Sequence, residues 1–380
     1  MKKTFPIMIL MCLVFSIHCN RDKSENIKEI VLNPKDESVD VEFTKEKSIL
    51  FTGVNYGRLF IYNEGSNGNF YIYVSGYDSE TEKKERVKKY DSDLNFISQK
   101  EFPFGQGPGD VGTGTTFCQV GDYIYGPDNV FRRVSVFDKN FNFIKFVKMI
   151  GTVLSTTFTK DGDYFWGFES MWHQKGHTVY LVRCIFPGLN RNRIHRIGTY
   201  WMWNKQKKHI VGKNPHLSFF IKKERIYFLN SADYRIIMFD MKGNKLQQVR
   251  MSVDKQRVPK EKKKEWLIEQ TNPRLAKKCD LTDIIQPASW AIPLEKGFAV
   301  IKRKDYITGC RGLAEADYFD YQLNLLGKTR VPCFYQIFDL NSSYRMPESY
   351  SYQNGYLYLI YEDEEKEEYY LEKWKVEEKL

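Results

Sequence analysis

Few side chains in this sequence have the types and spacing of a catalytic or metal site. His173 and His177 lie four residues apart, a spacing that suits a metal ion when both histidines share a helical face and a carboxylate completes the site. Gly176 lies next to His177, and strand-like segments flank the pair, so we expect a solvent-exposed loop between two strands. A metal site is the alternative. We expect no metal and no cofactor.

Aromatic and basic residues gather around these histidines. Four of the seven tryptophans fall between 166 and 203, among several arginines. Aromatic faces beside cations suit sugar rings, aromatic peptides or an acidic partner. The candidate ligand-binding surface therefore consists of Trp172, His173, His177, Trp201, Trp203 and Arg193. Packing in the core and at blade contacts is nevertheless the favoured interpretation of these aromatic residues, because blade interfaces are rich in them.

Two short motifs resemble ligand-binding loops. The segment 107–112 matches G-x-G-x-x-G, but a dinucleotide site needs a helix after the glycines, and a β-branched, alternating segment follows here. The start of a calcium loop is suggested by Asp91, Asp93 and Asn95, yet the glycine and the glutamate of such a loop are absent. We therefore predict that the segment 107–112 forms a loop between two sheets. We predict that Asp91, Asp93 and Asn95 belong to a hairpin turn.

Common enzyme signatures are missing from the chain. There is no G-x-S-x-G elbow, no Walker sequence and no H-E-x-x-H motif. No C-x-x-C pair occurs among the seven cysteines, which argues against a zinc ribbon and a thioredoxin-type site. We therefore assign no catalytic residue. Whether the protein is an enzyme stays open, and the missing motifs favour a protein without catalytic activity.

The composition favours strands over helices. The 380 residues are 42% hydrophobic and 16% aromatic, with 25 Tyr, 27 Phe and only 13 Pro, which predicts an all-β protein with a large core. The net charge of +10 is dispersed along the chain, and the basic run 260–264 is balanced by the acidic run 362–368. We therefore expect no nucleic-acid partner.

The N-terminus has the pattern of an export signal. A charged start, Met1-Lys2-Lys3, precedes an apolar run from Phe5 to Ile17 that is too short for a comfortable membrane span. Cys19 and a polar stretch follow, which resembles a bacterial lipoprotein signal. We expect a signal peptide over 1–18, a lipid on Cys19 and a polar tether over 19–37. Ordinary cleavage or an uncleaved anchor is the alternative. The expected location is the bacterial cell envelope, with the protein held on a membrane.

A repeat is visible in the turns. Residues 124–138 match residues 226–240 at an offset of 102, each with a strand, a turn carrying arginine, and a strand that ends in Phe-Asp. Arg235 has the same place in its repeat as Arg132 or Arg133, which favours a structural bond to a neighbouring turn. Similar hairpin endings occur at Asp91, Asp138, Asp240 and Asp320.

Units of about 40 to 50 residues, each a small antiparallel sheet, are typical of a β-propeller. The spacing predicts six blades of four strands over 38–380, with seven as the alternative. A helical insertion over 253–285, between blades 4 and 5, explains the longer gap before Asp320. The strand-like segment from Val39 to Tyr62 is expected to complete the first or last blade and so close the ring.

The turn Phe104-Gly105-Gln106-Gly107-Pro108-Gly109-Asp110 resembles that of the bacterial six-bladed β-propeller family related to NHL-repeat proteins. The family commonly has Glu where this chain has Asp110. The resemblance implies a propeller fold and an exported, often lipid-anchored protein, but no settled activity.

These observations favour a non-catalytic binding or scaffold module for a protein or glycan partner. The alternative is a metal-dependent propeller lyase or lactonase with its site in the central channel, which would need carboxylates, Asn or His from several blades. The expected channel-lining segments, 117–119, 155–157 and 217–219, are instead apolar or hydroxyl-bearing.

Overall fold

The computed structural model describes residues 28–51, 58–64, 69–78, 84–112, 117–128, 131, 133–148, 157–158, 164–173, 176–185, 190–201, 209–211, 217–254, 257, 259–261, 263–264, 267, 279–281, 288–302, 313–332, 350–363 and 368–380. The predicted signal peptide, Cys19, Arg132 and Trp203 lie outside these residues.

The described chain is built from small sheets whose strands follow one another in sequence. The first sheet contains β3 (Arg58–Glu64), β4 (Asn69–Asp78), β5 (Lys84–Tyr90) and β6 (Phe96–Pro103). The second contains β7 (Cys118–Val120), β8 (Tyr123–Asp128), β9 (Arg133–Phe137) and β10 (Phe143–Lys148). The third contains β11 (Thr157–Phe158), β12 (Tyr164–His173), β13 (Gly176–Ile185) and β14 (Asn190–Trp201).

The second half of the chain repeats this order. One sheet contains β16 (Leu217–Lys222), β17 (Arg225–Asn230), β18 (Arg235–Asp240) and β19 (Lys245–Met251), with β1 (Ile30–Leu32) added outside β19. The next contains β21 (Ala288–Pro293), β22 (Gly297–Lys302), β23 (Leu313–Asp320) and β24 (Leu325–Pro332). The closing sheet contains β25 (Tyr350–Gln353), β26 (Tyr356–Asp363), β27 (Glu368–Glu378) and β2 (Val41–Phe51).

These sheets form a propeller-like, all-β fold, but not six four-stranded blades. Five sheets have four antiparallel strands, as predicted for a blade. The β16–β19 sheet has five strands, because β1 pairs with β19 in parallel. The prediction of six four-stranded blades is therefore wrong, since a segment assigned to the tether is a strand.

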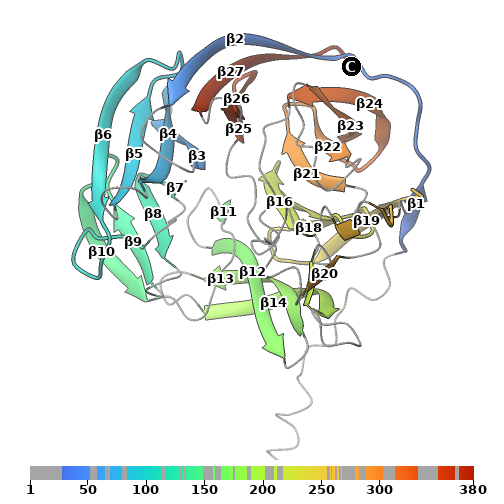
Figure 1. The fold of residues 1–380 in the computed structure, drawn as a ribbon, viewed down its shortest axis with the longest axis horizontal. Helices are drawn as coiled ribbons and strands as arrows, with labels where there is room; N and C mark the ends of the chain where they lie inside the picture. Colours follow the sequence, from blue (N-terminus) through green and yellow to red (C-terminus); the bar gives the residue numbers. More distant parts are fainter. Residues whose placement is uncertain are drawn as a thin grey trace, which may run out of the picture.

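The sheets follow one another around a central axis (Figure 1). Buried apolar clusters join consecutive sheets; one combines Tyr227 with Phe298, and another combines Tyr358 with Ile72. The last of these contacts closes the ring, because Tyr358 belongs to the closing sheet and Ile72 to the first sheet. Within the closing sheet, β2 pairs with β27 over its whole length, which confirms the predicted closure by an N-terminal strand.

The four predicted hairpin endings are confirmed and share one geometry. Oδ1 of Asp91 accepts the backbone N–H groups of Asp93 and Asn95 at 2.9 and 2.8 Å, and its Oδ2 accepts the Asn95 amide at 2.9 Å. Asp138, Asp240 and Asp320 make the same bonds to Asn142, Asn244 and Asn324. The fourth residue of each turn has a positive φ, from 58° at Leu94 to 90° at Gly243. We call Asp91, Asp138, Asp240 and Asp320 the hairpin aspartates.

The segment 253–285 does not form the predicted helical insertion in its described part. The Lys263 N–H donates to the carbonyls of Pro259 and Lys260, which makes a single helical turn. Cys279–Leu281 is strand β20, which pairs in parallel with β15 (His209–Val211). Among the described residues no helix is long and apolar enough to cross a membrane. The composition of the run that begins at Lys260 indicated a helix. Near the end of the segment, however, residues 279–281 form a strand because they pair with β15, which lies about 70 residues earlier in the chain.

The N-terminal segment runs along the outer edges of two sheets before it enters the ring. Its strand β1 pairs with β19, and the Lys328 N–H on β24 then donates to the Glu37 carbonyl at 2.8 Å. Glu29 secures its start, accepting from Gln248 at 2.5 Å and from Arg250 at 3.1 Å. From Lys28 onwards the predicted tether is therefore part of the folded protein.

Candidate functional site

The β12–β13–β14 sheet carries the predicted ligand-binding surface. The backbone register pairs Trp172 with His177 and His173 with Gly176, and it pairs Gly176 with Trp201 on the next strand. These four predicted residues, two Trp and two His, therefore meet at one end of the sheet. His173 ends β12 and His177 is the second residue of β13, so the expected loop is shorter than predicted and both histidines belong to strands.

Arg193 is separated from this group. It pairs with Val182, in the opposite half of β13, and its guanidinium lies 4.9 Å from the centre of the Tyr180 ring. This is a cation–π contact within the sheet itself. The structure thus brings together Trp172, His173, His177 and Trp201 along the backbone but not Arg193, and Trp203 lies outside the described residues.

The described part of the chain holds no group of three or more His, Cys, Asp or Glu residues that could bind a metal ion. Of the expected channel-lining segments, Phe117 and Ser218 are buried, and Gln119 bonds to a neighbouring strand. The Gln119 amide donates to the Asn63 carbonyl at 2.8 Å, and its oxygen accepts the Asn63 N–H at 2.7 Å. Gln119 therefore joins β3 to β7 and is not directed at a ligand.

The glycine-rich segment forms a loop between two sheets, as predicted. The Asp110 carboxylate accepts the Gly107 N–H at 2.8 Å, and a Cβ on Gly105 would lie 2.4 Å from that carboxylate. Arg133 completes the loop by donating to the carbonyls of Gln106, Gly105 and Asp110 at 2.8, 2.7 and 2.9 Å. The predicted structural bond from this arginine to a neighbouring turn is confirmed, and the glycines serve this close approach.

A buried carboxylate lies behind Arg133, and the sequence analysis did not identify it. The Asp128 side chain is fully buried, 3.6 Å from Nε of Arg133, and it accepts the Phe131 N–H at 3.0 Å. The guanidinium also lies 4.0 Å from the centre of the Phe146 ring. The available signal was the Asp-x-x-x-x-Arg spacing within the repeat, because its ends face each other across a hairpin.

A second buried carboxylate joins the β16–β19 sheet to the β21–β24 sheet. Asp317 accepts a hydrogen bond from the Tyr234 hydroxyl at 2.8 Å and lies 3.1 Å from the Lys302 ammonium. Burial, and then the nearby Asp317 charge, raise the pKa of Tyr234, so this phenol keeps its proton and donates it. The sequence analysis missed this group, because its three members come from three strands or turns far apart in the chain.

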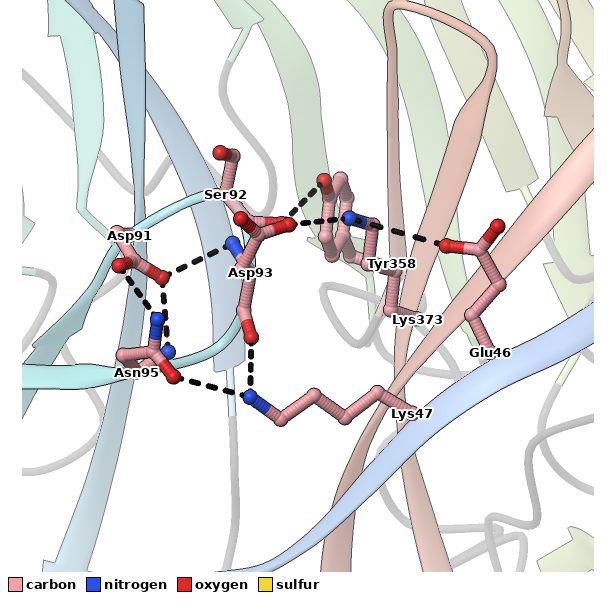
Figure 2. A network of polar contacts seen from close by, with 8 residues as sticks. All are labelled: Glu46, Lys47, Asp91, Ser92, Asp93, Asn95, Tyr358 and Lys373. Carbon is pink, nitrogen blue, oxygen red and sulfur yellow. Dashed lines mark hydrogen bonds and ion pairs between the residues drawn. The ribbon is translucent and has the colours of Figure 1, made fainter.

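Ring closure depends on a polar network between the closing sheet and the first hairpin turn (Figure 2). Lys373, whose side chain is 9% exposed, donates to Oδ1 of Asp93 at 2.7 Å and lies 3.8 Å from Glu46. Lys47 donates to the Asp93 carbonyl at 2.5 Å, and the Tyr358 hydroxyl donates to the Ser92 carbonyl at 3.0 Å. These contacts attach the last sheet to the first.

The Tyr358 contact recurs at two other sheet boundaries. Tyr73 donates to the Lys139 carbonyl at 3.3 Å, and Tyr227 donates to the Tyr321 carbonyl at 2.8 Å. In each case the acceptor directly follows the hairpin aspartate of the neighbouring sheet. We call Tyr73, Tyr227 and Tyr358 the latch tyrosines. The repeat therefore contributes a structural bond at three sheet boundaries.

The turn hydrogen bonds make Asp91, Asp138 and Asp240 ionise more readily, because they lower the pKa of these carboxyl groups. Partial burial alone would raise their pKa, but the hydrogen bonds from the turn backbone and from Asn outweigh it. The pKa is therefore lowered at Asp91, Asp138 and Asp240. These carboxylates are satisfied by their own turns, so the resemblance of Asp91–Asn95 to a calcium loop reflects turn geometry.

The sequential antiparallel sheets arranged in a ring define a β-propeller-like protein. No family model matches the chain, and no curated protein matches it, so the expected relation to NHL-repeat proteins is not shown. Among solved structures, the chain is similar to a member of the DUF4221 family from Bacteroides vulgatus ATCC 8482. The TM-score is 0.52 at 11% identity, over 90% of this chain and 100% of that chain. This similarity shows the fold alone.

A protein from Bacteroides fragilis NCTC 9343, named for its inferred export, gives a TM-score of 0.49. It is 12% identical, and the match covers 92% of this chain and 100% of that chain. The name describes that protein only.

Proposed function

We propose that this chain is an exported, lipid-anchored propeller that binds a protein or glycan partner without catalysing a reaction. The lipid would be carried by Cys19, which holds the protein on a membrane of the bacterial cell envelope. The partner would contact the end of the β12–β13–β14 sheet, where Trp172, His173, His177 and Trp201 meet along the backbone.

The observation that carries this proposal is that two tryptophans and two histidines meet along the backbone at the end of a long hairpin. β12 and β13 have 10 residues each and β14 has 12, whereas β8 has 6 residues and β9 has 5. At about 3.3 Å per residue, the extra four residues lengthen the hairpin by roughly 13 Å. Strands of this length also occur elsewhere in the ring, since β2 and β27 have 11 residues each. What supports a contact surface here is that aromatic residues and histidines come together at the end of the long hairpin.

Partner capture tests this proposal. The full chain carrying Trp172→Ala and Trp201→Ala would be compared with wild type for envelope proteins and glycans retained from native membranes. The matched control is Tyr123→Ala, which removes an aromatic residue that is 47% exposed on another sheet. We expect the double variant to lose the captured partner and the control to keep it, with equal thermal stability. Equal capture by all three proteins would contradict the proposal.

The same protein tests the enzyme alternative. Metal content and thermal stability would be measured with and without EDTA, because an ion bound only by the folded state must raise its stability. A stoichiometric ion whose removal lowers the melting temperature would favour a metal-dependent lyase or lactonase over a binding module.

A further inference from the structure

The rim formed by β1 and β19 has exposed apolar side chains beside the point where the N-terminal segment joins the propeller. Ile30 and Val31 on β1 are 46% and 50% exposed, and Leu246 on β19 is 42% exposed. β1 is the outermost strand of its sheet, so Ile30 and Val31 lie at the circumference of the ring, and Leu246 lies on the strand beside it. We call Ile30, Val31 and Leu246 the apolar rim.

Basic residues accompany the apolar rim, and the acidic residues near it are already engaged. Lys28 and Lys242 are exposed. Glu29 is bound by Gln248 and Arg250 and lies 3.1 Å from Arg235. Asp233 forms an ion pair of 2.7 Å with Arg235, and Asp240 is held by its own hairpin turn. The rim therefore presents exposed lysines close in sequence to exposed apolar side chains. Lysines beside apolar side chains are the combination that binds an anionic lipid surface.

The chain itself indicates which surface this rim meets. Cys19 precedes Ile30 by only 11 residues. A fully extended chain of that length reaches no more than about 37 Å. Another rim with exposed apolar residues is β6, where Phe96 and Ile97 are 59% and 46% exposed. That strand lies on the opposite side of the ring from β1 (Figure 1). An anchor on Cys19 therefore brings the β1–β19 rim to the membrane before the β6 rim.

We propose that the β1–β19 rim lies against an anionic membrane surface, with the apolar rim inserted at the headgroup level. The propeller then stands on its edge, with its central axis parallel to the membrane. This proposal rests on the proposed anchoring at Cys19 and adds the contact surface and its partner. It does not depend on which partner the β12–β13 hairpin binds.

Photo-crosslinking to lipids tests the orientation. The full chain, anchored in vesicles that contain a diazirine-bearing phosphatidylglycerol, is irradiated, and the labelled peptides are identified by mass spectrometry. We expect labels to concentrate in peptides covering 28–32 and 242–250. The labelling of these peptides should fall several-fold when the diazirine is carried by phosphatidylcholine in vesicles that contain no anionic lipid. Leu246→Glu should lower it, whereas the matched variant Ile97→Glu should leave it unchanged.

Two results would overturn the proposal: labels spread evenly over all rims, or equal effects of Leu246→Glu and Ile97→Glu. The mass of the N-terminal peptide shows whether Cys19 is acylated. This measurement therefore distinguishes a failure of the proposed anchoring from a failure of the proposed orientation. Failure of partner binding is read by the capture experiment, which uses neither rim.

Discussion

Replacing Arg133 with methionine tests how the loop between the first two sheets is held. The side chain donates to three backbone carbonyls at 2.7–2.9 Å, and its own side chain is only 10% exposed. It also faces Asp128, which has no exposed side-chain surface. Methionine preserves the apolar contact with Phe146 but removes the charge and all donors. The variant therefore leaves both the loop carbonyls and a buried carboxylate without their partner.

The expected cost follows from this burial. Removing one partner of a buried ion pair destabilises a protein by about 3–5 kcal/mol, because the remaining charge is left uncompensated. Arg235 provides the matched control, because it has the same place in its repeat but is 34% exposed, with Glu29 28% exposed. An exposed pair of this kind contributes about 0.2–1 kcal/mol. Arg133→Met should thus cost several times more than Arg235→Met.

Urea unfolding of the purified protein, followed by far-ultraviolet circular dichroism, measures both costs. A double-mutant cycle with Asp128→Asn then isolates the charge effect. The cost of Arg133→Met should fall by about 1–3 kcal/mol in the Asp128→Asn background, since no buried carboxylate remains to be compensated. Equal costs for Arg133→Met and Arg235→Met, or no coupling to Asp128, would refute the reasoning.

Three further predictions concern the hairpin aspartates, the latch tyrosines and the N-terminal segment. The folded-state pKa of Asp91, Asp138 and Asp240 is lowered, so their contribution to stability is complete above the unfolded value of about 3.9 and is lost as the pH falls through the folded values. Through these groups, unfolding midpoints should therefore change little from pH 7 to about 5 and should drop as the pH falls from about 5 towards 2. Asp138→Asn should weaken that drop; an unchanged slope would count against the turn bonds. Replacing Tyr227 with phenylalanine should cost about 1 kcal/mol in urea, because the buried Tyr321 carbonyl loses its donor. The same change at Tyr73 or Tyr358 should cost less, because those bonds are only partly buried, and Tyr123→Phe at an exposed site should cost nothing measurable. Glu29→Gln should speed hydrogen exchange at the backbone amides of β1. It should lower global stability by less than about 1 kcal/mol, because the side chains of Glu29, Arg235 and Arg250 are each 28–40% exposed. Unchanged exchange would show that pairing with β19 alone holds the strand.

The hairpins could be predicted because their causes are local. An aspartate followed four residues later by asparagine can close its turn from within, and this happens at all four predicted positions. The role of Arg133 was also accessible, because its repeat placed it beside a turn. The signals failed where a partner is distant: Asp317 accepts a hydrogen bond from Tyr234 of the neighbouring sheet, 83 residues away, and no spacing in the chain indicates that contact.

The candidate binding surface was predictable in part for the same reason. Trp172, His173 and His177 surround one short connection, so the hairpin register brings them together. Arg193 was grouped with them by proximity in sequence, but β14 is long enough to carry it to the other half of the sheet. Proximity along a strand of 12 residues is not proximity in space.

By itself, the sequence determined the strand-rich composition, the repeating hairpins and the use of an N-terminal strand for closure. These properties depend on alternation, on turn residues and on the need of the last sheet for an outer strand, all of which are encoded in short segments. Only the tertiary structure decided that β1 adds a fifth strand to the β16–β19 sheet, that β20 pairs with β15, and that the buried carboxylate of Asp317 joins two neighbouring sheets. The physical reason is that an edge strand exposes unpaired backbone groups that many segments could satisfy, so the choice depends on which segment the folded ring brings alongside.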